Sequence, residues 1–174
     1  PFLEHSPVGD GRDYDTGQIV TTNGPVRRNN ELWFYYVGLR YRNLSIADML
    51  ARKYLDSSAV CMARLRVDGF VSLKGGIEWG SVLSKPLKVD GSDIHLNVDS
   101  WRGQVCAEVL DGESNEALSG FGRDDSLPVV VDSTDVCLRW RGSGNLEGLM
   151  GRTVRLRFWI LNAELYAFWF TSLQ

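Results

Sequence analysis

The chain has 174 residues, of which 44% are hydrophobic and 24% charged, values typical of a globular protein. Its formal net charge of −3 gives no basis for expecting a nucleic-acid partner. No apolar run approaches the roughly 20 residues that a membrane-spanning helix needs, so we expect no membrane partner either.

The first part of the chain mixes loop-forming segments with aromatic-rich strands. Residues 1–24 contain many Gly, Asp and Pro residues, which favours loop with one short strand at 18–22. The elements expected next are a hairpin turn at 29–30, strands at 31–40 and 58–67, a short helix or structured loop within 45–54, and a strand at 70–73.

After Gly75-Gly76, short β-prone segments follow one another at roughly even spacing. Strands are expected near 82–89, 93–98, 104–110, 127–131, 134–140, 152–161 and 164–170, with one helical turn at 145–150. Many short strands with almost no helix predict an all-β, antiparallel β-sandwich of jelly-roll or concanavalin-like type. We expect a single domain over 1–174, with 77–170 as the sandwich core and the strands of 1–73 recruited to it.

Period-two alternation assigns the side chains of these strands to opposite faces. In 153–161 the even positions are apolar, whereas Arg155, Arg157 and Trp159 point the other way. If the strands share one sheet, a single outer face collects seven polar or aromatic side chains. They are His95, Asn97, Glu108, Arg139, Arg155, Arg157 and Trp159.

This mixture suits a sugar, because an aromatic ring stacks on the apolar face of a pyranose while planar polar groups hydrogen-bond its hydroxyls. Trp79 and Trp101, in turns bordered by Gly or Ser, are further ligand candidates because binding residues concentrate on loops. The competing interpretation is an ordinary polar sheet surface, with Trp159 packed beneath a loop.

The order of motifs adds a family resemblance. The segments D-Y-D-T-G-Q-I-V, N-N-E-L-W-F-Y-Y-V-G-L-R-Y-R and C-M-A-R-L-R-V-D-G-F-V-S-L resemble the last blade of the five-bladed propellers in the glycoside hydrolase 32/43-like group. The segments G-S-V-L-S-K-P-L, H-L-N-V-D, V-C-A-E-V-L-D, L-R-W-R-G and G-R-T-V-R-L-R-F-W-I-L-N-A-E-L-Y-A-F-W-F resemble the β-sandwich that follows it. The catalytic carboxylates of that family lie on earlier blades, which this chain lacks, so no catalytic residue can be carried over.

The resemblance implies an accessory module in a carbohydrate context, bound to a polysaccharide or oligosaccharide, in an extracellular or periplasmic setting. The expected function is therefore non-catalytic glycan binding. One alternative is a small glycoside hydrolase that uses Glu108 and Asp99 as its paired carboxylates. Another is a structural fragment that pairs with a second copy as a homodimer.

Metal and thiol chemistry receive little support. The acidic loop with Asp10, Asp13 and Asp15 is similar to oxygen-rich Ca²⁺ loops, but a solvated loop is the default expectation, and no other cofactor is expected. Cys61, Cys106 and Cys137 each lie in a strand-like apolar run without a C-x-x-C spacing, so we expect reduced core thiols, which do not exclude a cytoplasmic location.

Overall fold

The structure is a computed structural model that describes residues 2–7, 12–41, 45, 47, 51 and 56–171. The chain divides into two compact units, Pro1–Val67 and Asp68–Gln174. We expected one domain, but the strands of the first unit form a sheet of their own. Most of the helical segment expected within 45–54 lies outside the described residues.

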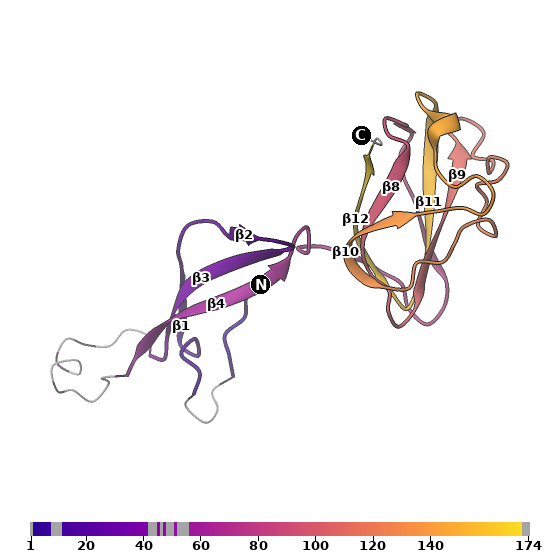
Figure 1. Cartoon of the computed structure of the whole chain (residues 1–174). Coiled ribbons are helices and arrows are strands. Elements are labelled where there is room, and N and C mark those ends of the chain that lie inside the picture. Colours follow the sequence, from indigo (N-terminus) through magenta and orange to yellow (C-terminus); the bar gives the residue numbers. More distant parts are fainter. Residues whose placement is uncertain are drawn as a thin grey trace. The chain divides into compact units, whose positions relative to one another are not determined.

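The first unit is built around one long strand. Its strands are β1 (Gln18–Thr21), β2 (Val26–Arg28), β3 (Glu31–Leu39) and β4 (Ser58–Arg66). Both β1 and β2 pair with one edge of β3, and β4 pairs with the other edge, all antiparallel (Figure 1). The expected turn at 29–30 joins β2 to β3, and Asn29 has the positive φ of 51° that a two-residue hairpin favours.

The two faces of this N-terminal sheet differ in exposure. On one face Tyr36 is buried, its hydroxyl donates to Asp15 at 2.7 Å, and the rings of Phe2 and Phe34 meet edge to face. The other face carries apolar side chains that remain accessible to solvent. They are Val20, Val26, Tyr35, Val60 and Met62, of which Val60 is 77% exposed.

Over its described residues, 68–171, the second unit contains eight strands and one short 3-10 helix. They are β5 (Leu73–Lys74), β6 (Gly80–Leu83), β7 (Leu87–Lys88), β8 (Asp93–Asp99), β9 (Gln104–Asp111), β10 (Asp132–Leu138), η1 (Glu147–Leu149), β11 (Thr153–Leu161) and β12 (Glu164–Thr171). The strand expected at 127–131 is reduced to an isolated bridge between Val129 and Val105. The helical turn expected at 145–150 is confirmed by η1.

These strands form two antiparallel sheets. Sheet I has the order β10-β8-β12-β5, and in sheet II β6 and β7 pair with one edge of β11 while β9 pairs with the other. Along the chain β8, β10 and β12 belong to sheet I, whereas β9 and β11 between them belong to sheet II. This order is that of a jelly roll, in which β6 and β7 share one strand position and the bridge at Val129 marks another. The expected all-β sandwich is thus confirmed.

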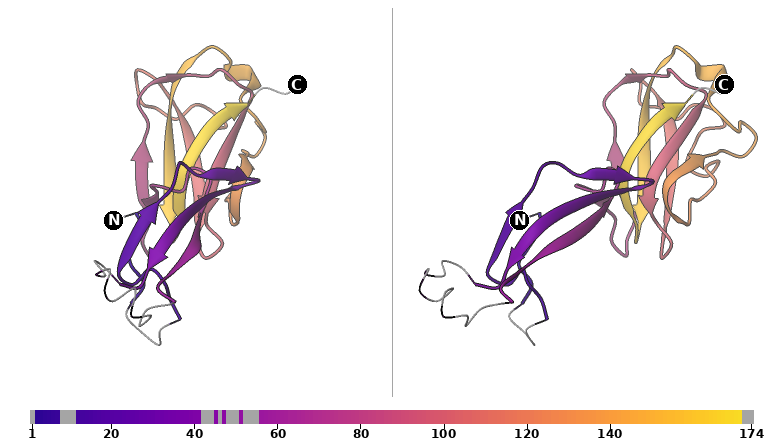
Figure 2. Two further views of the ribbon diagram at one scale, coloured as in Figure 1. Left: turned by 90° about the vertical axis from the view of Figure 1, so that its left-hand side faces the viewer. Right: turned by 60° about the vertical axis from the view of Figure 1, so that its left-hand side comes forward.

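The core of the sandwich follows the predicted alternation. Ile94, Leu96 and Val98 of β8 are 0% exposed, and so are Val154 and Leu156 of β11. Burying a side chain of this size contributes about 1.5–3 kcal/mol, which makes the interior between the sheets the main source of stability. In Figure 2 the axes of the long strands, from pink β9 to yellow β12, are roughly aligned, although neighbouring strands are antiparallel. The turns therefore gather at the two ends of the sandwich.

Candidate ligand-binding site

The predicted wall of polar side chains is divided between the two sheets. His95 and Asn97 on β8 belong to sheet I, while Glu108 on β9 and Trp159 on β11 belong to sheet II. The prediction that these side chains share a single outer face is therefore wrong. Alternation shows which residues of a strand share a face, but successive strands of a jelly roll cross from one sheet to the other.

On the outer face of sheet II, the predicted residues bind one another. Glu108 is 8% exposed, and its carboxylate accepts hydrogen bonds from the indole nitrogen of Trp159 at 2.8 Å and from Arg157 at 3.2 Å. The strand register explains the contact, because Glu108 and Arg157 are direct cross-strand partners. Arg155 donates instead to the backbone carbonyl oxygens of Gly112 and Ser84.

Arg123, which the sequence did not single out, completes this arrangement. Its guanidinium carbon lies 4.2 Å from the ring centroid of Trp79 and 4.4 Å from that of Trp159. Both indoles are thus partly covered by a cation from the same chain. We call Trp79, Glu108, Arg123, Arg157 and Trp159 the arginine–tryptophan cluster.

On the outer face of sheet I, the polar groups are also engaged. His95 contacts Asp135 through Nδ1 and stacks on Trp169, and Arg139 forms an ion pair with Asp93. Burial opposes ionisation of Asp93, but Arg139 and Ser92 outweigh it and hold the pKa of that carboxyl below its usual value. Asn97 is 1% exposed, so its side chain is not available at the surface.

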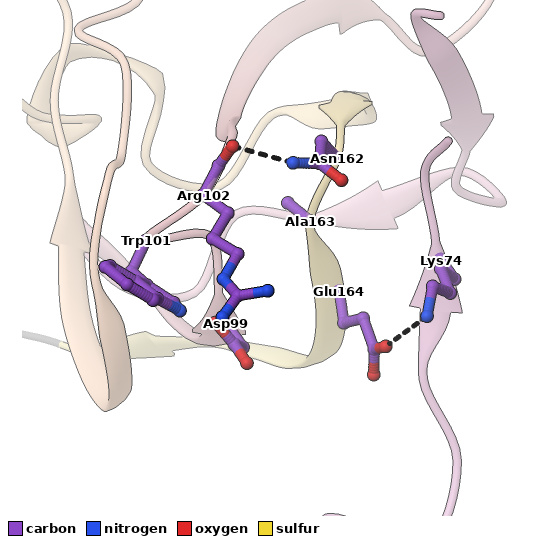
Figure 3. Close-up of a pocket in the computed structure, with 7 residues that line it drawn as sticks. All are labelled: Lys74, Asp99, Trp101, Arg102, Asn162, Ala163 and Glu164. Carbon is purple, nitrogen blue, oxygen red and sulfur yellow. Dashed lines mark hydrogen bonds and ion pairs between the residues drawn. The ribbon is translucent and has the colours of Figure 1, made fainter. Parts of the chain in front are cut away.

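A pocket of about 360 Å³ lies at one end of the sandwich (Figure 3). It lies beside the turn between β8 and β9 and the turn between β11 and β12, which meet because Asp99 pairs with Glu164 and Gln104 pairs with Leu161. We call it the end pocket. It is lined by Lys74, Asp99, Trp101, Arg102, Asn162, Ala163 and Glu164.

The two turns are joined to each other. The Asn162 side-chain amide donates to the Arg102 carbonyl oxygen at 2.7 Å, and Asn162 adopts a positive φ of 44° to do so (Figure 3). A Cβ atom on Gly103 would overlap the carbonyl oxygen of Leu161, so only glycine fits there. A strained non-glycine residue held by its surroundings is a feature found often at functional sites.

Of the four charged side chains that line the pocket, two form an ion pair with each other and two do not. Lys74 lies 3.1 Å from Glu164, which also accepts hydrogen bonds from Tyr166 and Ser72, and these contacts lower the pKa of the Glu164 carboxyl. Within the described part of the chain, the carboxylate of Asp99 and the guanidinium of Arg102 make no ion pair.

Trp101 is the most accessible tryptophan of the predicted set, with 61% of its surface exposed. The guanidinium carbon of Arg102 lies 5.0 Å from the centroid of its ring. Arg102 extends from its turn towards Asp99 in the view of Figure 3, with Trp101 beside it. An exposed indole therefore lies next to unpaired polar groups of both signs.

The alternative catalytic pair does not assemble. Asp99 lines the end pocket at the end of β8 in sheet I, whereas Glu108 lies on the outer face of β9 in sheet II. The two sheets of a sandwich are about 10 Å apart, so outward side chains on opposite sheets do not face a common cleft. A glycosidase needs its carboxyl groups about 5–10 Å apart across the sugar.

The calcium candidates of the N-terminal loop that the structure describes, Asp13 and Asp15, belong to no group placed to hold a metal ion. Asp15 is buried against Tyr36, whose hydroxyl group, together with that of Ser6, lowers the pKa of the Asp15 carboxyl. Asp13 is exposed, and Asp10 lies outside the described residues. Among the residues that the structure describes, no group of three His, Cys, Asp or Glu side chains is placed to hold a metal ion.

The three cysteines are free thiols, with Cys106 buried. Burial raises the pKa of the Cys106 and Cys137 thiols, so neither is an activated nucleophile at neutral pH.

Comparisons of the chain with protein-family models, with curated proteins and with solved structures found no match. None of the helices in the described part of the chain is long and apolar enough to cross a bilayer. The glycoside hydrolase resemblance thus stays a hypothesis.

Sequence reasoning identified Trp101 and Asp99 but missed the other polar residues of the end pocket. Lys74, Arg102, Asn162 and Glu164 come from three segments, and only the strand register places them together. The one sequence signal was the interruption of the strand pattern at Asn162.

Proposed function

We propose that the chain is a carbohydrate-associated β-sandwich module that binds a glycan without cleaving it, and that the end pocket is the binding site. The observation that carries the proposal is the exposed indole of Trp101 beside a pocket lined by Asp99, Arg102 and Asn162. Sugar recognition requires an apolar surface for the ring and polar groups that both donate to and accept from hydroxyls. The outer faces of the sheets fit this role less well, because their polar groups are already bound to one another.

The chemistry of the Glu164 carboxylate supports the proposal that the module does not cleave its ligand. A glycosidase needs one carboxylic acid that stays protonated near neutral pH. Glu164 has the opposite tendency, because Lys74, Tyr166 and Ser72 favour its ionised form.

The test is a screen of the full chain on a panel of neutral and acidic oligosaccharides, followed by isothermal titration of each ligand found. Trp101→Ala should weaken binding by about tenfold or more, which corresponds to ~1.4 kcal/mol. Met150→Ala is the matched control, because Met150 is similarly exposed but follows η1, at the opposite end of β11. Equal binding by Trp101→Ala and the parent chain, or no binding to any glycan, would reject the proposal.

A second candidate is self-association through the N-terminal sheet. The exposed apolar face with Val20, Val60 and Met62 favours it, because large exposed apolar patches often mark interfaces. A second copy presenting the same face would cover it. Sedimentation equilibrium should then show a mass that rises with concentration. Val60→Lys should abolish the rise, whereas Val130→Lys, at another exposed site on the second unit, should not.

A further inference from the structure

We infer that the end pocket selects neutral sugars over acidic ones, with the Asp99 carboxylate as the specificity-determining group. The inference rests on the proposed glycan binding and narrows its ligand class. It follows from the charges that line the pocket, taken one by one.

The first pair of charges, Lys74 and Glu164, forms an ion pair within the chain. Lys74 and Glu164 lie 3.1 Å apart, and Ser72 and Tyr166 donate to the same carboxylate. Because the charge of Lys74 is balanced by that of Glu164, the two together add no net charge to the pocket. Glu164 in turn already accepts from three donors, which leaves it about one of the four acceptor sites of a carboxylate for a hydroxyl.

The second pair of charges, Asp99 and Arg102, is available to a ligand. Asp99 and Arg102 are not ion-paired to any described residue, so each can hydrogen-bond a ligand. Arg102 is held against the Trp101 ring at 5.0 Å, and its backbone oxygen is fixed by Asn162. Since the Asn162 amide nitrogen is used in that bond, its side-chain oxygen is left as a second acceptor.

Together these groups match a neutral polyol. A hydroxyl donates to one acceptor and accepts from one donor, so neighbouring hydroxyls can bridge Asp99 and Arg102 at the same time. The formal charges of Lys74, Arg102, Asp99 and Glu164 sum to zero, so the lining has no net positive charge to attract an anion. A uronate carboxylate drawn to Arg102 would meet Asp99 in the same pocket, and like charges placed together are a common means of rejecting a ligand.

The experiment compares two ligand classes on matched variants of the full chain. Isothermal titration is run with neutral manno-, xylo-, gluco- and galacto-oligosaccharides and with oligogalacturonides and oligoglucuronates of similar length. The parent chain should bind a neutral series at least tenfold more tightly than any acidic one, with affinity nearly independent of salt between 0.05 and 0.5 M. Asp99→Asn should weaken the neutral ligand by about fivefold to tenfold and strengthen the acidic ones.

Asp124→Asn is the control, since it makes the same charge change at an exposed position outside the pocket, and it should alter neither series. Preferential binding of uronates that depends on Trp101 would overturn the inference while leaving glycan binding intact. An unchanged preference in Asp99→Asn would also overturn it. Failure of every oligosaccharide to bind the parent chain would instead overturn the proposed function, and the inference with it.

Discussion

The arginine–tryptophan cluster and the end pocket contain the same kinds of side chains, but they differ in what those side chains contact. In the cluster, Arg123 lies between two indoles, and Glu108 accepts from Trp159 and Arg157. In the end pocket, Trp101 is 61% exposed, and the Asp99 carboxylate makes no hydrogen bond or ion pair with a described residue. Residue type alone therefore does not identify a binding site; the decisive property is whether the polar groups are already satisfied within the chain.

This contrast predicts that changes in the cluster lower stability without altering ligand binding. The largest effect is expected for Glu108→Ala, which leaves the Trp159 and Arg157 donors without their acceptor in a half-buried site. We expect the free energy of unfolding to fall by about 2–3 kcal/mol. Urea denaturation followed by far-UV circular dichroism measures it, with Glu116→Ala, a charge removed from an exposed turn, as the neutral control. Glycan affinity at the end pocket should stay unchanged.

Arg123→Ala should have the next largest effect, because it removes the cation that covers Trp79 and Trp159. The loss of two cation–π contacts should cost about 1–2 kcal/mol of stability. It should also raise quenching of tryptophan fluorescence by acrylamide, as both indoles become more accessible. If quenching does not change, Arg123 does not shield the rings in solution.

In the end pocket, two substitutions at Asn162 distinguish the free-energy cost of backbone strain from the contribution of its side-chain hydrogen bond. Asn162→Ala combines an unfavourable positive φ with loss of the bond to the Arg102 carbonyl oxygen and should cost about 1–2 kcal/mol. Asn162→Gly loses the bond but tolerates the φ of 44°, so its cost should be below about 1 kcal/mol. Thermal or urea unfolding of the two variants side by side tests the difference, and equal stabilities would show that strain at this turn is negligible.

The smallest effect concerns pH. Contacts with Lys74, Tyr166 and Ser72 depress the pKa of Glu164 in the folded protein below its usual value. The ionised carboxylate therefore adds stability above the unfolded pKa, and this contribution is lost as the pH falls through the lower, folded pKa. Glu164→Gln should accordingly flatten the decline in unfolding free energy between pH 6 and pH 3. An equally steep decline in the variant would mean that other carboxylates cause it.

The period-two pattern was sufficient to predict most of the long strands and their buried sides, although the strand expected at 127–131 is an isolated bridge. It placed Leu96 and Phe158 inside, and both are buried in the core. It could not assign the strands to sheets. Alternation is a property of each strand by itself, whereas the change from sheet I at β8 to sheet II at β9 depends on the whole fold. For the same reason His95 and Trp159 were expected on one wall, although they lie on different sheets.

The end pocket was only partly predictable. Trp101 stood out as an aromatic residue in a turn, and it is exposed as expected. Lys74 and Glu164 could not be connected to it, since they are 90 residues apart and meet only through the pairing of β5 with β12. Arg123 was likewise missed, because a flexible-looking acidic loop gives no sign that its arginine reaches two distant indoles.

The glycine at position 103 has a consequence for how this scaffold can diversify. Because Gly103 and the Asn162–Arg102 bond fix the path of both turns, the side chains at 101 and 102 project from a frame that does not depend on their identity. Substitutions there leave the sheet interior untouched. The turn between β8 and β9 is therefore a natural place to randomise when new ligand specificities are selected from a library built on this fold.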